Sequence, residues 1–288
     1  MYGAGHVLGV DSGRGTSYWQ KDHGQYYRTL PSHNTVIPNG NADYPSHGDG
    51  TIAMQVKAVE PAFDTPASEQ NLTYLTASFA HQKPKATQQR TLALVRINET
   101  SAFYFDVFRS RLSKPTSNEY HDWLYHGMAD TLELEQLALT TSSVLTSKNG
   151  NMAGYDYFEN EVSATTAADI HARFPLIIAT DKVAMDVWVL GGEGRTVFAV
   201  DAPANRAARH NYDEKYWNKP TPTLIVRQQG EAWNRPFVSV YEPSLQSDSV
   251  KIQSVQVVAE NTWRVNGKDW HALLSLKGVK LEVKINQK

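Results

Sequence analysis

The chain has 288 residues, of which 41% are hydrophobic and 20% are charged, and this balance is typical of a folded globular protein. The 28 Lys and Arg residues are offset by 30 Asp and Glu residues, and the net charge of −2 does not indicate a nucleic-acid partner. No apolar run approaches the roughly 20 residues that a membrane helix needs. The lack of cysteine excludes disulfides, thiolate metal sites and cysteine nucleophiles.

The first eleven residues do not form a secretory signal peptide. They contain neither a basic segment followed by an apolar one nor a cleavage site with small residues. The apolar run 7–10 resembles the middle of a strand without a preceding turn. We therefore expect either a cytosolic protein or a chain that has been trimmed upstream of Met1.

Short runs of β-branched, aromatic and alternating apolar residues follow one another along the chain and predict strands. In chain order, these runs are 7–10, 52–56, 71–79, 91–97, 103–108, 132–134, 183–190, 196–200, 223–227, 237–241, 255–258, 263–265, 273–276 and 281–285. Turn residues separate them at 38–40, 49–50, 148–150, 266–267 and 277–278. The pattern predicts an all-β protein with a large antiparallel sandwich or barrel, in one unit over residues 1–288. We expect a softer joint near 205–222, where Asn, Pro and charged residues collect.

Two expectations concern local connections. The glycine-rich segment 191–194 is expected to join the runs 183–190 and 196–200 into a hairpin, and the runs 223–227 and 237–241 are expected to form a second pair. The best helix candidate is 159–174, although its Thr-rich centre weakens this prediction.

The chain lacks the common catalytic motifs. It has no Gly-x-Ser-x-Gly elbow, no phosphate-binding Walker loop and no His-Glu-x-x-His segment. The segment Asp11–Gly15 is rich in glycine, but no βαβ pattern surrounds it, so a tight turn is favoured over a phosphate cradle. The pair Asp213-Glu214 is expected on the solvated surface.

Residues 6–49 contain an unusual density of His, Tyr, Trp, Asp and Arg, including four of the ten histidines. Such groups suit proton abstraction next to a carboxylate, because a base takes the proton, a cation offsets the developing charge and an acid protonates the leaving oxygen. Trp and Tyr also stack on sugar faces. The alternative is that these are ordinary loop and core residues.

The segment His33-Asn34-Thr35-Val36 is the most distinctive motif. One interpretation is a capping or core histidine at the start of a strand. The other is a metal ligand, with Asp11 as a second ligand, because Zn²⁺ accepts imidazole nitrogen and carboxylate oxygen. Two ligands do not complete a tetrahedral site, so a third must come from elsewhere; His6 and His23 are candidates that their spacing does not single out.

Several segments together resemble the heparinase II/III-like polysaccharide lyases. The segments that carry this resemblance are Tyr2–Gly13, Tyr26-Tyr27 and His33–Val36, together with 105–109, 121–127, 222–227 and 237–243 in what is similar to that family's C-terminal β-sandwich. The resemblance implies lyases with an N-terminal (α/α) toroid and a C-terminal β-sandwich. It further implies cleavage of uronic-acid-containing polysaccharide by β-elimination, in a cleft between the two domains.

The resemblance also assigns roles to residues of this chain. It implies a zinc ion held by two histidines and an aspartate, with Asp11 and His33 as two of these ligands. The remaining histidine and the helical toroid would lie upstream of Met1, so the chain alone is expected to be weakly active or inactive. The full-length protein is then expected in the periplasm or outside the cell, with an acidic polysaccharide or oligosaccharide and the missing helical domain as its partners.

Other residues are expected around this site. Tyr26, Tyr27 and Trp19 are candidates for lining the sugar cleft, whereas His121, Asp122 and His126 are expected to form a polar network inside the sandwich. Two alternatives remain open. The chain could be a stand-alone carbohydrate-binding β-sandwich, or a structural β domain in which the His and Tyr residues are incidental.

Overall fold

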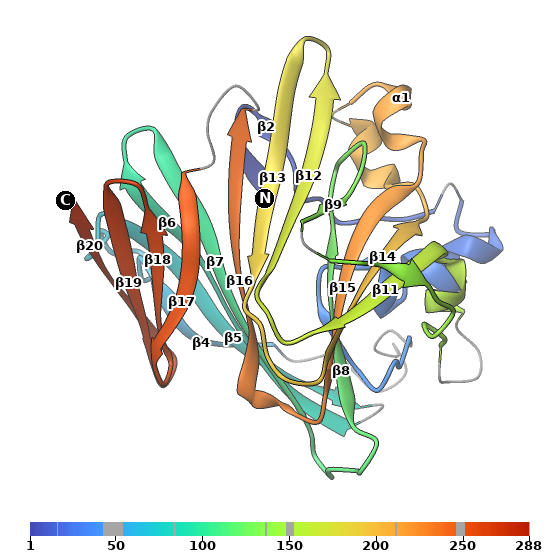
Figure 1. Ribbon diagram of the computed structural model, residues 1–288, viewed down its shortest axis with the longest axis horizontal. Helices are drawn as coiled ribbons and strands as arrows, with labels where there is room; N and C mark the ends of the chain where they lie inside the picture. The colour runs from blue at the N-terminus through green and yellow to red at the C-terminus, as the bar shows by residue number, and fades with distance from the viewer. Residues whose placement is uncertain are drawn as a thin grey trace.

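The computed structural model describes residues 1–15, 17–42, 54–82, 85–135, 137–147, 153–210, 212–245 and 251–287. In these ranges the regular structure is almost entirely antiparallel β-sheet, arranged in layers (Figure 1). The helical segments are short: η1 (His23–Tyr27), η2 (Leu30–Ser32), η3 (Gly154–Tyr157), η4 (Arg206–His210) and α1 (Glu214–Trp217). The predicted all-β sandwich is therefore confirmed, and the described residues contain no helical toroid.

The central layer is an eight-stranded sheet in the order β4-β5-β6-β7-β16-β13-β12-β9. Its strands are β4 (Gln55–Glu60), β5 (Leu72–Gln82), β6 (Lys85–Asn98), β7 (Ser101–Leu112), β9 (Glu133–Leu134), β12 (Ile170–Ile178), β13 (Asp181–Val189) and β16 (Ala232–Leu245). In β7, Phe105 and Val107 lie on one face, while Phe108 packs into the core on the other face. The strand is rich in aromatic and β-branched residues because both of its faces are covered.

A six-stranded sheet covers one face of the central layer, in the order β10-β11-β14-β15-β8-β3. Its strands are β3 (Val36–Pro38), β8 (Tyr120–His126), β10 (Thr140–Thr141), β11 (Glu159–Thr166), β14 (Arg195–Ala202) and β15 (Thr221–Gln229). The core between the two sheets contains Tyr125 and Val226 from the six-stranded sheet and Phe174 and Tyr241 from the central one. The rings of Tyr125 and Phe174 meet edge to face at 5.0 Å.

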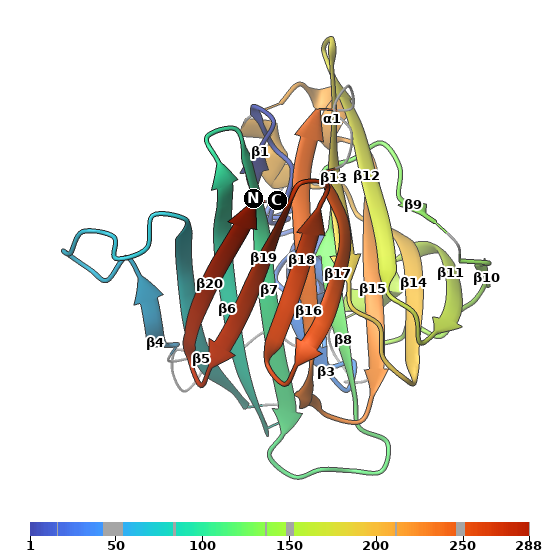
Figure 2. The ribbon, with the colours of Figure 1, turned by 60° about the vertical axis from the view of Figure 1, so that its left-hand side comes forward.

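The C-terminal segment forms a four-stranded meander on the opposite side of the central sheet (Figure 2). Its strands are β17 (Ile252–Ala259), β18 (Thr262–Gly267), β19 (Trp270–Lys277) and β20 (Lys280–Gln287). Trp263 packs against Phe105 of the central sheet, with ring centroids 5.4 Å apart. The predicted turn at 277–278 joins β19 to β20, and Gly278 there has a positive φ of 66°.

Three local predictions are wrong. Segment 191–194 connects β13 of the central sheet to β14 of the six-stranded sheet, and 230–231 likewise connects β15 to β16, so neither connection is a hairpin. The expected helix 159–174 is instead β11 followed by the start of β12, because its Val, Ile and Thr residues favour extended backbone.

The segment 205–222 contains η4 and α1 and joins β14 to β15, which are neighbours in one sheet. Within it Tyr216 is buried in the core, and Asp213 and Glu214 are exposed, as predicted. The expected turns at 49–50 and 148–150 lie outside the described residues. The turn expected at 266–267 is also wrong, because both residues belong to the end of β18. No helix in the described ranges is long and apolar enough to cross a membrane.

Candidate functional site

Asp11 and His33 are 22 residues apart in sequence but lie side by side at the edge of the six-stranded sheet. The chain after β2 (His6–Val7) pairs through a single bridge between Gly9 and Gly127, the residue that directly follows β8. His33 follows η2 and precedes β3, which also pairs with β8. Both segments are therefore positioned by the same strand.

Asn34 fixes the two segments relative to each other. Its side-chain amide donates to the backbone carbonyl of Val10 at 3.1 Å, and its side-chain oxygen accepts from the backbone N–H of His126 at 2.7 Å. Arg90 of β6 donates to the Asn34 carbonyl at 2.9 Å and forms a bidentate ion pair with the fully buried Asp106. Sequence reasoning missed Asn34 and Arg90 as positioning residues, because their contacts come from distant parts of the chain.

The contact between Asp11 and His33 is short and open to solvent. His33 Nδ1 lies 2.7 Å from Asp11 Oδ2, and the two side chains are 34% and 61% exposed. Asp11 Oδ1 accepts from the backbone N–H of Gly13 at 3.0 Å, which forms the tight turn expected for this glycine-rich segment. Burial by itself would raise the pKa of Asp11, but the hydrogen bond and charge of His33 outweigh it and hold that pKa below its usual value.

His126 lies close to this pair but faces the interior. It is 1% exposed, and its Nδ1 lies 2.8 Å from the hydroxyl oxygen of Thr223. Burial, assisted by the charge of His33, lowers the pKa of His126 to about 4. The ring is therefore neutral at physiological pH and is part of the sandwich interior.

The remaining predicted network is also internal. Asp122 accepts from Arg227 and from the Tyr155 hydroxyl, and His121 contacts Glu119 at 3.0 Å. All five of these side chains are at least 90% buried. The three predicted residues therefore lie inside the sandwich, each with its own hydrogen-bond partners.

The donors Asp11 and His33 are of the types that zinc accepts, but they are only two. The part of the chain that the structure describes contains no group of three His, Cys, Asp or Glu residues arranged to hold a metal. His6 instead contacts Asp181 at 3.1 Å, and the buried His23 accepts from the Gly15 N–H. Neither histidine completes the site. The two donors are of types that bind zinc, but they are fewer than the ligands that a tetrahedral zinc site needs.

The predicted sugar-lining residues fall into two groups. Tyr26 is 0% exposed and Tyr27 is 2% exposed, and the Tyr27 hydroxyl donates to the Ala204 carbonyl at 2.8 Å and accepts from Arg206. In this structure both tyrosines are buried and anchor their own segment, η1, to the protein interior. Trp19, in contrast, is 96% exposed and is available to a ligand.

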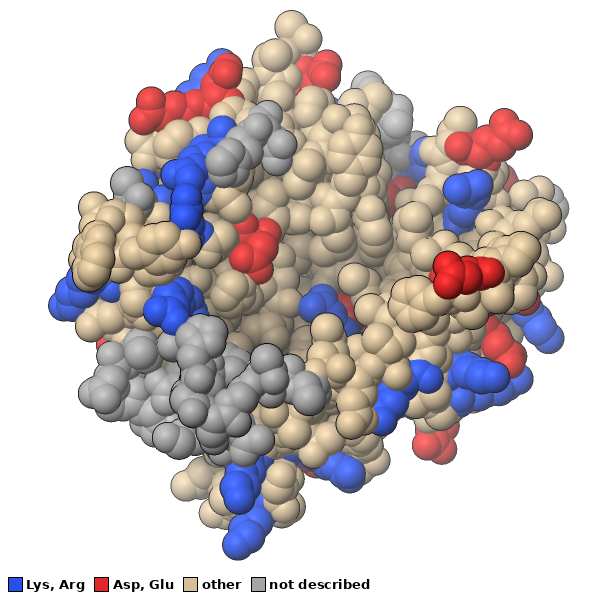
Figure 3. All heavy atoms as spheres, turned by 180° about the vertical axis from the view of Figure 1, so that it is seen from behind, with Lys and Arg blue, Asp and Glu red and all other residues tan. Residues whose placement is uncertain are grey.

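The surface opposite to the view of Figure 1 is hollowed at its centre (Figure 3). Both Lys or Arg and Asp or Glu side chains appear on this face among the residues that the figure colours. The mixture is that expected from the net charge of −2.

Comparison with known proteins adds an independent observation. The chain is 32% identical over 282 residues to an endo-acting ulvan lyase from Formosa agariphila, in an alignment that covers 90% of this chain and 32% of that protein. The chain thus spans about a third of that relative's length. Among solved structures, the heparinase III BT4657 gene product matches 98% of this chain and 34% of its own, with 11% identity and a TM-score of 0.49. No family model matches.

Proposed function

We propose that this chain is the β-sandwich portion of a polysaccharide lyase that cleaves uronic-acid-containing polysaccharide by β-elimination. The observation that carries the proposal is the 32% identity to an ulvan lyase across 90% of the chain. The adjacency of Asp11 and His33, which the resemblance to heparinase II/III-like lyases pairs in one site, supports it.

The proposed reaction removes a proton next to the uronate carboxylate and expels the glycosidic oxygen. We propose that Asp11 and His33 supply two ligands to a zinc ion, whose third protein ligand lies outside the described residues. Such an ion, when bound, supplies positive charge against developing negative charge on the substrate. The contribution of this chain is to hold the two donors together, through the Asn34 clamp and β8.

The other site residues take supporting roles in this proposal. Trp19 offers an exposed aromatic face to a sugar ring, whereas the buried Tyr26 and Tyr27 keep their own segment, η1, in place. The acid and base of the elimination would come from a helical domain beyond this chain, so this chain alone should be weakly active or inactive. We further propose that the full-length protein acts in the periplasm or outside the cell, where polymeric substrate is found.

The test is an elimination assay on ulvan and on a neutral polysaccharide, because unsaturated uronic ends absorb in the near ultraviolet. The 288-residue chain and a longer protein that contains it should be compared. In the longer protein, His33→Ala should reduce the rate at least tenfold and lower the bound zinc, while the exposed control Asp213→Asn should change neither. Full activity in the His33→Ala protein would remove this pair from the mechanism.

A second candidate is a stand-alone carbohydrate-binding module, which the almost complete exposure of Trp19 favours. Acidic polysaccharide in an electrophoresis gel would slow the migration of such a module, and Trp19→Ala would abolish this retardation. Because Trp19 makes few contacts, this change should leave the thermal midpoint within about 1 °C of the parent value. Retardation without any ultraviolet signal from the longer protein would favour this candidate over the lyase.

A further inference from the structure

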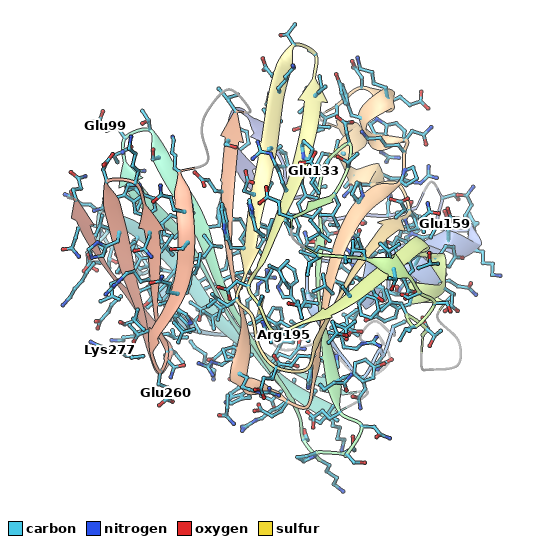
Figure 4. All side chains as sticks on the ribbon, viewed as in Figure 1. Glu99, Glu133, Glu159, Arg195, Glu260 and Lys277 are labelled. Carbon is cyan, nitrogen blue, oxygen red and sulfur yellow. The ribbon has the colours of Figure 1, made fainter. Side chains whose placement is uncertain are left out.

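A cavity of about 230 Å³ lies between the β13–β14 connection, the first half of β16 and the β17–β18 hairpin. None of the residues that line it belongs to the Asp11–His33 site. Two of the lining residues are Arg195, at the start of β14, and Glu260, at the turn between β17 and β18. Both are labelled in the lower half of Figure 4. Val257, which lines the cavity from the hairpin, is 64% exposed, so the cavity opens to solvent.

Arg195 is the buried polar group of this cavity and is only 3% exposed. Its guanidinium donates to the side-chain oxygen of Gln228 at 2.8 and 3.1 Å, to the Pro236 carbonyl at 3.2 Å and to the Leu190 carbonyl. Gln228 is itself held by donating to two backbone carbonyls. Every acceptor that the structure gives Arg195 is therefore a neutral oxygen.

A second guanidinium stands beside it. The exposed Arg235 also lines the cavity and donates to the backbone carbonyls of Gln229, at 2.9 Å, and Glu193, at 3.4 Å. Among the described residues, no ion pair within 4.0 Å includes either Arg195 or Arg235.

The nearby carboxylates are turned to other partners. Asp169 accepts from the Gly191 N–H, and Glu231 accepts from two backbone N–H groups of its own turn. Glu260 lies at the rim, where its charge acts, with that of Glu231, on Arg109. The charge of Asp169 acts on Arg195 and Glu260 lines the cavity, but among the described residues neither Arg195 nor Arg235 forms a direct ion pair with a carboxylate.

A buried cation without a direct ion pair is costly, and a bound anion would reduce that cost. Burial and the charge of Arg235, opposed by the charge of Asp169, lower the pKa of Arg195 to about 10, which leaves Arg195 charged at neutral pH. The lining of the cavity also includes the apolar side chains of Val257, Val238 and Trp263. A cavity lined by both cationic and apolar side chains matches a sugar residue that carries an oxyanion.

We propose that this cavity binds the carboxylate or sulfate ester of an acidic sugar residue through Arg195 and Arg235, as an accessory site apart from Asp11 and His33. The ligand class rests on the proposed function. The cavity would hold a residue of the polysaccharide chain away from the point of cleavage. It therefore adds a substrate-binding role to the face formed by the C-terminal meander.

The experiment measures binding of three monosaccharides to the 288-residue chain by NMR, following the side-chain Nε–H resonances of the arginines. The probes are glucuronate, glucose 6-sulfate and neutral glucose. At least one anionic probe should bind about tenfold or more tightly than glucose. The comparison of glucuronate with glucose 6-sulfate shows which oxyanion is preferred. The arginine resonances that shift should be those of Arg195 and Arg235.

Three single variants make the test specific. Arg235→Gln should weaken the anionic probe roughly tenfold, and because Arg235 is exposed, this variant should fold even if changes at Arg195 do not. Glu260→Gln should leave binding unchanged or strengthen it, since it removes a negative charge from the rim. Arg264→Gln, an exposed arginine on β18 outside the cavity lining, is the matched control and should have no effect.

The proposal is overturned if neither anionic probe binds more tightly than glucose, or if Arg235→Gln leaves the Kd unchanged. These outcomes are independent of cleavage, because monosaccharides have no internal glycosidic bond to eliminate. An elimination assay without product, together with anion binding that depends on Arg235, would reject the lyase function and keep the anion site.

Discussion

Replacing Asp122 by Asn should destabilise the sandwich by about 3–5 kcal/mol, because it breaks a fully buried ion pair. Asp122 is 0% exposed and accepts from Arg227 Nε at 2.7 Å, Arg227 Nη2 at 2.9 Å and the Tyr155 hydroxyl at 2.7 Å. Asn has nearly the same shape and keeps one acceptor oxygen. The cost therefore comes mainly from the charge of Arg227, which is 7% exposed and would lose its counter-ion.

The matched control is Glu282→Gln in the pair with Lys277, whose side chains are 52% and 68% exposed. Solvent screens this pair, so its loss should cost at most about 1 kcal/mol. Urea unfolding followed by tryptophan fluorescence gives both values, as a shift in midpoint at constant slope. If Asp122→Asn cost no more than Glu282→Gln, the buried pair would not stabilise the fold as argued. Adding Arg227→Gln to Asp122→Asn should recover part of the loss, because it removes the stranded charge.

Two other predictions concern packing and pH. Gly127→Ala should destabilise the fold by about 1–3 kcal/mol in thermal unfolding, because a Cβ there would lie 2.2 Å from the Phe174 ring. His171 contacts Asp186 at 3.0 Å and Glu135 at 3.6 Å; burial would lower its pKa, but these carboxylates outweigh burial and raise it. Its protonated form thus contributes stability that is fully present below the unfolded pKa of about 6.5 and is lost as pH rises through the folded pKa.

Controls are available for both predictions. Gly24→Ala should be nearly neutral, because no atom lies within 4 Å of the added Cβ. For the pH effect, the difference in free energy of unfolding between the parent protein and His171→Gln should shrink from pH 6 to pH 8.5. A difference that stays constant over this range would show that His171 does not titrate in its contact with the carboxylates.

The strands of this protein are largely a local property of its sequence. The run 103–108 is strand in β7, and the runs in the last forty residues are the strands of the C-terminal meander, because β-branched and aromatic residues favour extended backbone. The tight turn at Asp11–Gly13 and the turn at Gly278 also follow from residue type, through an Asp side chain and a glycine with positive φ.

The partners of those strands are not a local property. The glycines at 191–194 suit a hairpin equally well, but β13 is already paired along both edges, with β12 and with β16, so the chain crosses to the other layer before it pairs again. The same holds for the candidate site. Residue type alone nominated Asp11 and His33, whereas their contact depends on β8 and on the Asn34 clamp, and the burial of Tyr26 and Tyr27 depends on residues more than 100 positions away.

The sequence by itself therefore determined the all-β class, most strand positions and the residue types of the Asp11–His33 site. Only the tertiary structure decided which layer each strand joins, which aromatic side chains reach solvent, and that Arg195 lies buried beside a cavity without a direct ion pair among the described residues. The physical reason is that hydrogen bonding and alternation are set by neighbouring residues, whereas burial and charge compensation are set by residues that meet only after the sheets have packed.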